Sequence, residues 1–334
     1  MKDIMRSLLT VRKQVQSLFA EWNVYLVMAA KTALTFAVIL SINAVFPYRA
    51  VLTRGLIVAA VAILCSVLPW GFITVFGLIF LLGQLTALSL EAALFVLVLA
   101  IALAVLNYLT LPGASVLWVL LPLLYYWKIP FVVPLLAGLF GGITTFVSVG
   151  SGTVISFVLK LIRDNAPLLS GASSVTESGQ TVNTLVQRLL FLVEGFLKNN
   201  EMILTLIVFC LTTLLVNLLS RTDVDYAHVI ALGAGGLFCP VLLAVSLRYA
   251  GISVSAGSLI LNTLFALVAA FAVDFLATGL DYARTEKVQF EDDDYYYFVK
   301  AVPKMKLPEE KMREKAQALQ QELKKTAEET KKGR

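Results

Sequence analysis

The chain of 334 residues has a single histidine and three isolated cysteines, Cys65, Cys210 and Cys239. One histidine cannot supply paired imidazole ligands for a metal, and we expect no Ser-His-Asp triad. The cysteines lie far apart inside apolar runs, which is typical of small buried hydrophobes rather than of disulfides or metal ligands. The sequence also lacks a G-x-x-x-x-G-K-[ST] phosphate loop. We therefore expect no enzymatic activity, no metal and no cofactor.

Charge is scarce as well, at 15% of residues where a soluble domain carries roughly a quarter. Residues 23–283 contain only ten Lys/Arg and nine Asp/Glu, whereas the remaining 73 residues contain 30 of the 49 charges. Mean hydropathy is +0.84. A chain whose charges are concentrated at its two ends and whose body is this apolar belongs in a bilayer, because hydrocarbon tolerates few ionised side chains. The net charge of +5 is explained by membrane topology, so we expect no nucleic-acid partner.

Long apolar runs make up the body of the chain, and none shows the alternation of an outer-membrane strand. The runs are Val24–Phe46, Gly55–Pro69, Trp70–Leu90, Ala92–Tyr108, Met202–Leu219, His228–Tyr249 and Ile252–Leu280. The first run is too long for a signal peptide and is expected to be a retained helix. The fold class predicted is an all-α polytopic transmembrane helical bundle with eight to ten crossings.

The order of segments predicts five regions. They are a basic amphipathic interfacial helix (1–22), a first transmembrane group (23–162), an extracytoplasmic loop with an amphipathic helix (163–201), a second transmembrane group (202–283) and a cytosolic tail (284–334). The first helix could instead pack on the membrane domain. Four basic residues before the first span and thirteen in the tail place both termini in the cytosol.

Residues 109–152 are apolar but interrupted, and they are the first candidate site. The breaks considered as a binding site are Pro122, Pro130, Pro134, Gly138 and Gly142. Two broken pieces within 114–148 could form a re-entrant pair followed by a crossing at 149–162, or both could cross fully. Transporters place binding sites at such interruptions, although Gly138 and Gly142 also form a G-x-x-x-G pair suited to plain helix contact.

Two intramembrane charges are the second candidate. Lys31 and Asp274 lie about seven residues from the same end of the first and last spans, roughly 10 Å deep at a rise of 1.5 Å per residue. Opposite charges at matched depth predict an ion pair that joins these helices. The alternative is that Lys31 extends to the headgroups and Asp274 meets a hydroxyl or backbone group.

The tail is the third candidate. Two β-prone runs around Asp292–Asp294 predict a hairpin, and a helix with a narrow apolar stripe follows Pro308. An isolated hairpin is barely stable in water, so it needs a second surface. Tyr295, Tyr297, Leu319 and Leu323 are therefore candidate residues for docking a protein partner or a second copy of the chain. A solvated, frayed tail is the alternative.

The ending DYARTEKVQFEDDDYYYFVKAVPK at Asp281–Lys304 resembles that of an uncharacterised family of bacterial polytopic membrane proteins. The KIPFVVPLLAGLFGG stretch at 128–142 and the RTDVDYAH turn at 221–228 are similar too. The resemblance implies a bacterial plasma membrane, with the lipid bilayer as the first partner. It implies no activity, so the leading hypothesis is a membrane-embedded subunit or scaffold that docks a partner through its tail. The alternative is a small-solute transporter or channel-like protein using 109–152.

Overall fold

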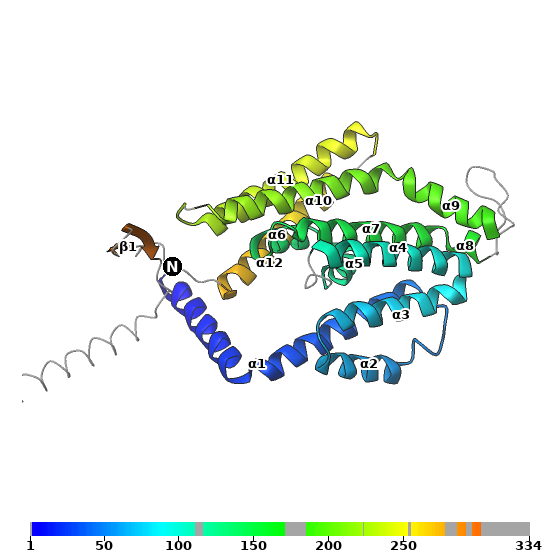
Figure 1. Ribbon diagram of the computed structural model, residues 1–334, viewed down its shortest axis with the longest axis horizontal. Coiled ribbons are helices and arrows are strands. Elements are labelled where there is room, and N and C mark those ends of the chain that lie inside the picture. Colours follow the sequence, from blue (N-terminus) through cyan, green and yellow to red (C-terminus); the bar gives the residue numbers. More distant parts are fainter. Residues whose placement is uncertain are drawn as a thin grey trace, which may run out of the picture. The chain divides into compact units, whose positions relative to one another are not determined.

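The computed structural model describes residues 2–110, 116–170, 185–222, 224–252, 255–277, 286–291 and 296–301, with side chains described within 24–277. One compact unit is Val24–Phe271, and the other comprises Met1–Asn23 and Ala272–Arg334. The elements are α1 (Lys2–Val45), α2 (Gly55–Val67), α3 (Gly71–Leu88), α4 (Leu90–Thr110), α5 (Leu117–Tyr126), α6 (Val132–Phe140), α7 (Thr145–Asp164), α8 (Ala166–Leu169), α9 (Leu185–Leu197), α10 (Asn200–Ser220), α11 (Ala227–Tyr249), α12 (Ala256–Ala277), β1 (Glu286–Glu291) and β2 (Tyr296–Ala301) (Figure 1).

Seven described helices are long and apolar enough to cross a membrane: α1 from Val24, α3, α4, α7, α10, α11 and α12. Their outward faces carry large apolar side chains; Val98, Leu237 and Phe265 are each at least 60% exposed. Leaving such side chains in water forgoes about 1.5–3 kcal/mol apiece, so these faces belong against lipid. The chain is therefore a multi-pass integral membrane protein, as its composition predicts.

Polar contacts set the directions of the first three helices. Near one end, Gln84 of α3 donates to Asn43 of α1 at 2.8 Å, and the Arg49 amide donates to Gln84 at 2.7 Å. Near the other end, Lys31 Nζ of α1 donates to the Leu68 carbonyl just after α2, at 2.9 Å. Since Leu68 and Gln84 meet α1 at separate levels, α2 runs opposite to α1 and α3. The helix α2 has 13 residues, fewer than a full span, and extends between these two levels of α1.

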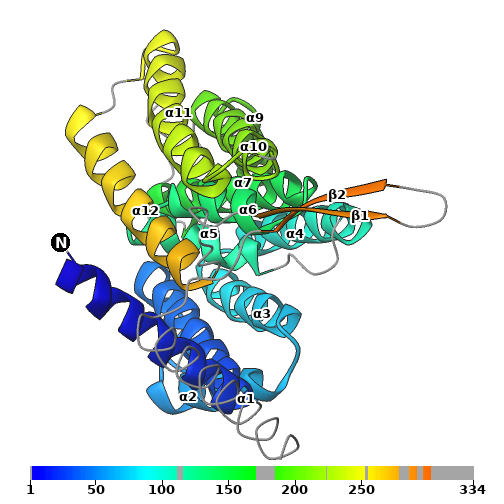
Figure 2. The ribbon, with the colours of Figure 1, turned by 90° about the vertical axis from the view of Figure 1, so that its left-hand side faces the viewer.

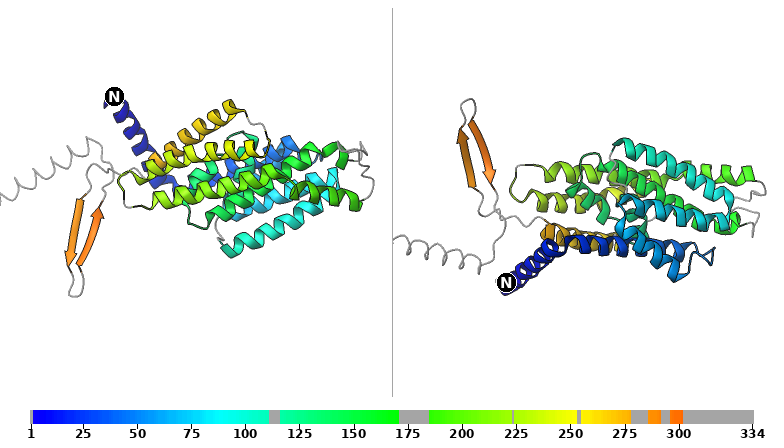
Figure 3. Two further views of the ribbon diagram at one scale, coloured as in Figure 1. Left: turned by 90° about the horizontal axis from the view of Figure 1, so that it is seen from above. Right: turned by 60° about the horizontal axis from the view of Figure 1, so that its bottom comes forward.

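The unit has two main apolar clusters. One joins α5, α6, α10 and α11 through residues such as Leu121, Phe131, Phe209 and Leu232. The other joins the end of α1 to α3, α4, α7 and α9. The helices α7, α10 and α11 lie side by side, with α10 in the middle (Figure 3). Between α10 and α11 the backbones approach closely, because a Cβ on Gly235 would overlap the Val216 side chain.

The interrupted region forms two short helices followed by a complete one. The helix α5 has 10 residues and α6 has 9, whereas α7 begins at Thr145 and runs unbroken for 20 residues. Neither short helix reaches the roughly 20 residues of a span. The helix that follows them begins at 145 instead of 149, and the re-entrant pair stays a prediction.

Two boundaries differ from those predicted. The predicted extracytoplasmic loop at 163–201 begins with helical structure, because α7 extends to Asp164 and Ala166–Leu169 is a helical turn. Asn165 makes this extension possible, because its side chain donates to the Leu161 carbonyl and its backbone accepts from Leu169. At the N-terminus, α1 is continuous across the expected boundary at residue 22. The interfacial position of residues 1–22 stays a prediction.

In the other unit, β1 and β2 pair antiparallel, with Glu286 opposite Ala301 and Glu291 opposite Tyr296 (Figure 2). The strand pair flanks Asp292–Asp294, where the β-prone runs of the sequence suggest a hairpin. Its cytosolic location and its docking role stay predictions. The expected tail helix and the candidates Tyr295, Leu319 and Leu323 lie outside the described residues.

Candidate functional site

The five predicted residues of the broken region do not form a single site. Pro122 lies inside α5 and lines a cavity. Pro130 and Pro134 are buried at the start of α6. Gly138 is a helix contact, because a Cβ there would lie 2.7 Å from the Thr213 carbonyl of α10. Gly142 follows the end of α6 and has only the Thr144 hydroxyl within 4 Å of an added Cβ. The G-x-x-x-G pair is thus not one packing surface.

The end of α6 is held by α10. Asn217 Nδ2 donates to the Gly138 carbonyl at 3.0 Å and to the Gly141 carbonyl at 2.8 Å. Arg221 Nη2 adds a bond of 3.2 Å to the Gly141 carbonyl. The last carbonyls of a helix lack intrahelical partners and cannot face lipid unpaired. These side chains therefore allow a helix to end inside the protein.

A cavity of about 520 Å³ opens beside this broken region. Its walls come from α1, α3, α4, α5 and α7, with Lys128 after α5 and Glu201 in the first turn of α10 completing it. Small-molecule sites are typically clefts of roughly 300–1,000 Å³ lined mainly by apolar and aromatic side chains with a few polar groups. This cavity fits that description.

The cavity has an apolar end and a charged end. Gly152 of α7 lies against α5 near Leu117 and Leu121, whereas the Tyr125 ring of α5 packs on Phe157 of α7 with centroids 5.7 Å apart. The two helices therefore run in the same direction. Lys128, three residues after Tyr125, and Lys160, three residues after Phe157, accordingly lie toward the same end.

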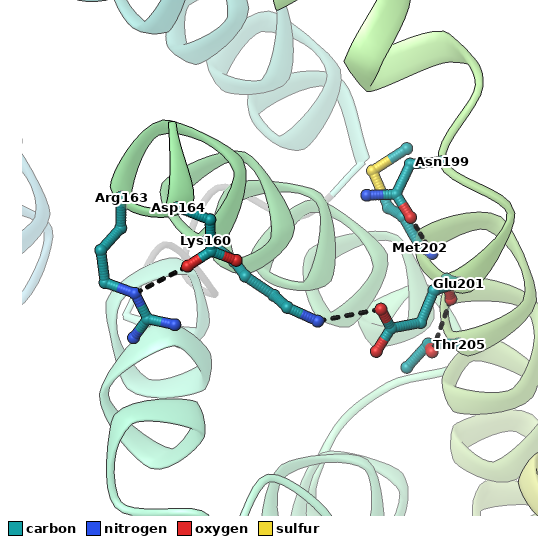
Figure 4. A network of polar contacts seen from close by, with 7 residues as sticks. All are labelled: Lys160, Arg163, Asp164, Asn199, Glu201, Met202 and Thr205. Atoms are coloured by element: carbon teal, nitrogen blue, oxygen red, sulfur yellow. Dashed lines mark hydrogen bonds and ion pairs between the residues drawn. The ribbon is translucent and has the colours of Figure 1, made fainter. Parts of the chain in front are cut away.

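At the charged end, Lys160 Nζ donates to Glu201 Oε2 at 2.9 Å, and the two side chains are 47% and 36% exposed (Figure 4). Arg163, one turn further along α7, points instead to Asp164, with Nε 3.2 Å from Oδ1. Lys160 Nζ also lies 5.5 Å from the centre of the Phe157 ring. These contacts place cationic groups beside an aromatic wall.

The position of Glu201 follows from the local sequence. Asn199 caps α10, because its Oδ1 accepts from the Met202 amide at 2.9 Å (Figure 4). A carboxylate in the first turn of a helix is stabilised by the helix dipole. The Thr205 hydroxyl donates to the Glu201 carbonyl at 2.7 Å, which continues the same turn. The carboxylate is thus held at the start of α10, facing Lys160.

Lys128 adds a further cation. Its backbone has φ of +62°, a left-handed conformation that is uncommon for a residue with a side chain. The chain reverses here between α5 and α6. The side chain is exposed, and its ammonium group has no acidic partner among the described residues. With Lys160, Arg163, Glu201 and Asp164, the charged end carries a net charge of +1.

The apolar end is formed by side chains such as Val38, Trp118 and Val119, with Gly77 between α1 and α5. The indole N–H of Trp118 is buried and finds no acceptor in the described part of the chain. Pro122 stands four residues later in α5 and has no amide to donate to the Trp118 carbonyl. The wall here is thus aromatic, locally irregular and free of charge.

The predicted pair of Lys31 and Asp274 is split between the two units, so the pairing stays a prediction. The structure shows a different contact for Lys31. Its ammonium group donates to the Leu68 carbonyl at the end of α2 and lies 5.5 Å from the centre of the Trp70 ring. A cation at a helix C-terminus is stabilised by the helix dipole. Lys31 therefore caps α2.

The sequence reasoning missed the charged cluster of Lys160, Arg163 and Glu201. Lys160 and Arg163 are three residues apart near the end of a helix, a spacing that puts them on one face. That signal was readable, but Glu201 is 41 residues from Lys160, and their meeting depends on helix packing. A buried pair was missed for the same reason: Arg188 of α9 lies 3.6 Å from Glu91 at the start of α4.

No group of three or more His, Cys, Asp or Glu side chains could hold a metal ion within the described ranges. Of the docking candidates, only Tyr297 falls on a described element, where it pairs with Phe290 across the two strands. Searches against protein-family models, curated proteins and solved structures find no match to this chain.

Proposed function

We propose that this protein is a membrane transporter that binds a small solute in the cavity beside α5. The observation that carries the proposal is the cavity of about 520 Å³ with charged groups at one end, lined by α5, which is one of two half-length helices in the interrupted region. Transporters build midplane binding sites from discontinuous helices, since interrupted backbone is tolerated only where protein or a cavity surrounds it.

The orientation belongs to the same proposal. With α2 as an eighth crossing beside the seven longer helices, the chain returns to the side on which α1 starts, and the excess of basic residues at the two ends makes that side the cytosol. The charged end of the cavity then faces the outside. The resemblance of the C-terminal segment supports a bacterial plasma membrane.

A cysteine-accessibility experiment tests whether the cavity admits water. Ser156 lines the cavity, while Thr153, on the same helix, is fully buried and does not line it. In sealed vesicles, Ser156→Cys should react with a membrane-impermeant thiol reagent, and Thr153→Cys should not. Wild type supplies the background from the three native cysteines.

Labelling from both faces of the vesicle, each at a measurable rate, is the result expected of alternating access. Labelling from one face alone would show a dead-end binding site and would overturn transport. A rate for Ser156→Cys no higher than that for Thr153→Cys would overturn the cavity itself.

The docking role of the tail is a second candidate, supported by the β1–β2 pair, which is barely stable without another surface. Affinity purification of the intact chain and of a chain ending at Ala283 tests it. A partner that co-purifies only with the intact chain is expected. Identical sets of partners would overturn the scaffold hypothesis.

A further inference from the structure

We infer that the cavity takes an amphiphile with an anionic headgroup, such as a single-chain alkyl phosphate. This inference rests on the proposed function and names the class of its substrate. It follows from two properties of the cavity wall: the sign of the charge at one end and the uncharged, apolar character of the other.

The charged end favours an anion. Three cationic side chains, Lys128, Lys160 and Arg163, line it with one carboxylate, Glu201, and with the Asp164 carboxylate that pairs with Arg163 the end keeps a net charge of +1. Arg163 is engaged by Asp164 only through Nε, so the two terminal nitrogens make no hydrogen bond to the described residues. Guanidinium and ammonium groups arranged this way recognise phosphate and carboxylate oxygens. A cationic ligand would face net repulsion here.

The other end favours an alkyl chain. Trp118 and Tyr126 both line the cavity and lie eight residues apart within α5, which corresponds to about 12 Å along the helix at a rise of 1.5 Å per residue. Over this length the lining is mostly apolar, with Val38, Trp118 and Val119 at the far end. A small hydrophilic anion would leave the apolar end of the cavity in contact with water, whereas an alkyl chain would remove this apolar surface from water.

Glu201 acts as a stand-in for the ligand. In the structure its carboxylate accepts a hydrogen bond from Lys160 Nζ at 2.9 Å. An incoming anionic headgroup has to compete with Glu201 for this ammonium group. Binding therefore exchanges one anion for another at Lys160, and the affinity should depend on Glu201 in the opposite sense from its dependence on the cations.

The test is equilibrium binding of dodecyl phosphate to the full-length protein in an uncharged maltoside detergent, measured by calorimetry. Lys160→Gln should weaken binding about tenfold, the lower end of the effect of losing a hydrogen bond to a charged group, because this site is half exposed. Glu201→Gln should tighten it. The matched control is Lys198→Gln, which removes a cation from an exposed ion pair with Glu194 that does not line the cavity.

Two probes separate the parts of the inference. Dodecyltrimethylammonium, with the same chain and a cationic head, should not bind; binding equal to that of dodecyl phosphate would overturn the role of charge. Inorganic phosphate should compete only weakly; full competition would show a site for free phosphate and overturn the role of the chain. Equal effects of Lys160→Gln and Lys198→Gln would also overturn the assignment.

The outcome is independent of the accessibility test. If Ser156→Cys is labelled from both faces but dodecyl phosphate does not bind, transport stands and the substrate class is wrong. If Ser156→Cys is not labelled and dodecyl phosphate does not bind, both proposals fail.

Discussion

Replacing Asn217 by leucine tests the idea that α10 holds the broken end of α6. The side chain donates to the carbonyls of Gly138 and Gly141, and it is 2% exposed. Leucine has a similar size but no donor. The Gly141 carbonyl would keep its bond from Arg221, so one buried carbonyl, that of Gly138, would lose its only side-chain partner.

The expected loss follows from that count. An unpaired buried acceptor costs about 1–3 kcal/mol, whereas side-chain bonds inside membrane proteins average about 0.6 kcal/mol. The lower figure applies where the lost partner can be replaced, whereas Gly138 and Asn217 are both buried here. We expect a loss of about 1–2 kcal/mol, or on the order of 2–8 °C in Tm by the scaling for domains of similar size.

The assay is thermal unfolding in detergent of the Asn217→Leu and Thr213→Val variants. Thr213 is the control, because its hydroxyl bonds only the Phe209 carbonyl of its own helix. A double variant that adds Arg221→Met should lose more stability than the sum of the two single losses, because it also leaves the Gly141 carbonyl without a side-chain donor among the described residues. If Asn217→Leu is as stable as Thr213→Val, the end of α6 is not held in this way.

Three further outcomes follow from single contacts. Gly235→Ala should destabilise the protein by about 1–3 kcal/mol in thermal unfolding, because its Cβ would overlap α10. Gly233→Ala, whose Cβ would have no described atom within 4 Å, should be neutral or stabilising. Equal effects of the two variants would contradict the close approach of α10 and α11. Glu91→Ala should cost about 1–3 kcal/mol, because it leaves its partly buried guanidinium partner on α9 with only the Leu169 carbonyl among the described residues. A loss below about 0.5 kcal/mol, the level of a surface change, would contradict this. Exchange of charges at Lys31 and Asp274 should rescue the unfolding temperature lost in either single reversal if the two pair, whereas additive losses would show independent roles.

The sequence predicts the membrane location and the helical class from composition alone, because twenty uncharged apolar residues in a row have few stable alternatives to a transmembrane helix. It also places the interruption at 109–152, since proline and glycine act on their own segment of backbone. Within that segment it overestimates Gly142, which lies past the end of α6 and contacts the first residue of α7, Thr145, through its carbonyl.

Only the tertiary structure brings Lys160 to Glu201 and Asn217 to Gly138, pairs separated by 41 and 79 residues. Apolar periodicity shows which face of a helix is buried but not which helix covers it, because lipid and protein are equally apolar neighbours. The cavity exists only because particular helices pack next to one another. The scarcity of charge within residues 23–283 thus determines where the chain resides, and helix packing decides which of its few charges meet.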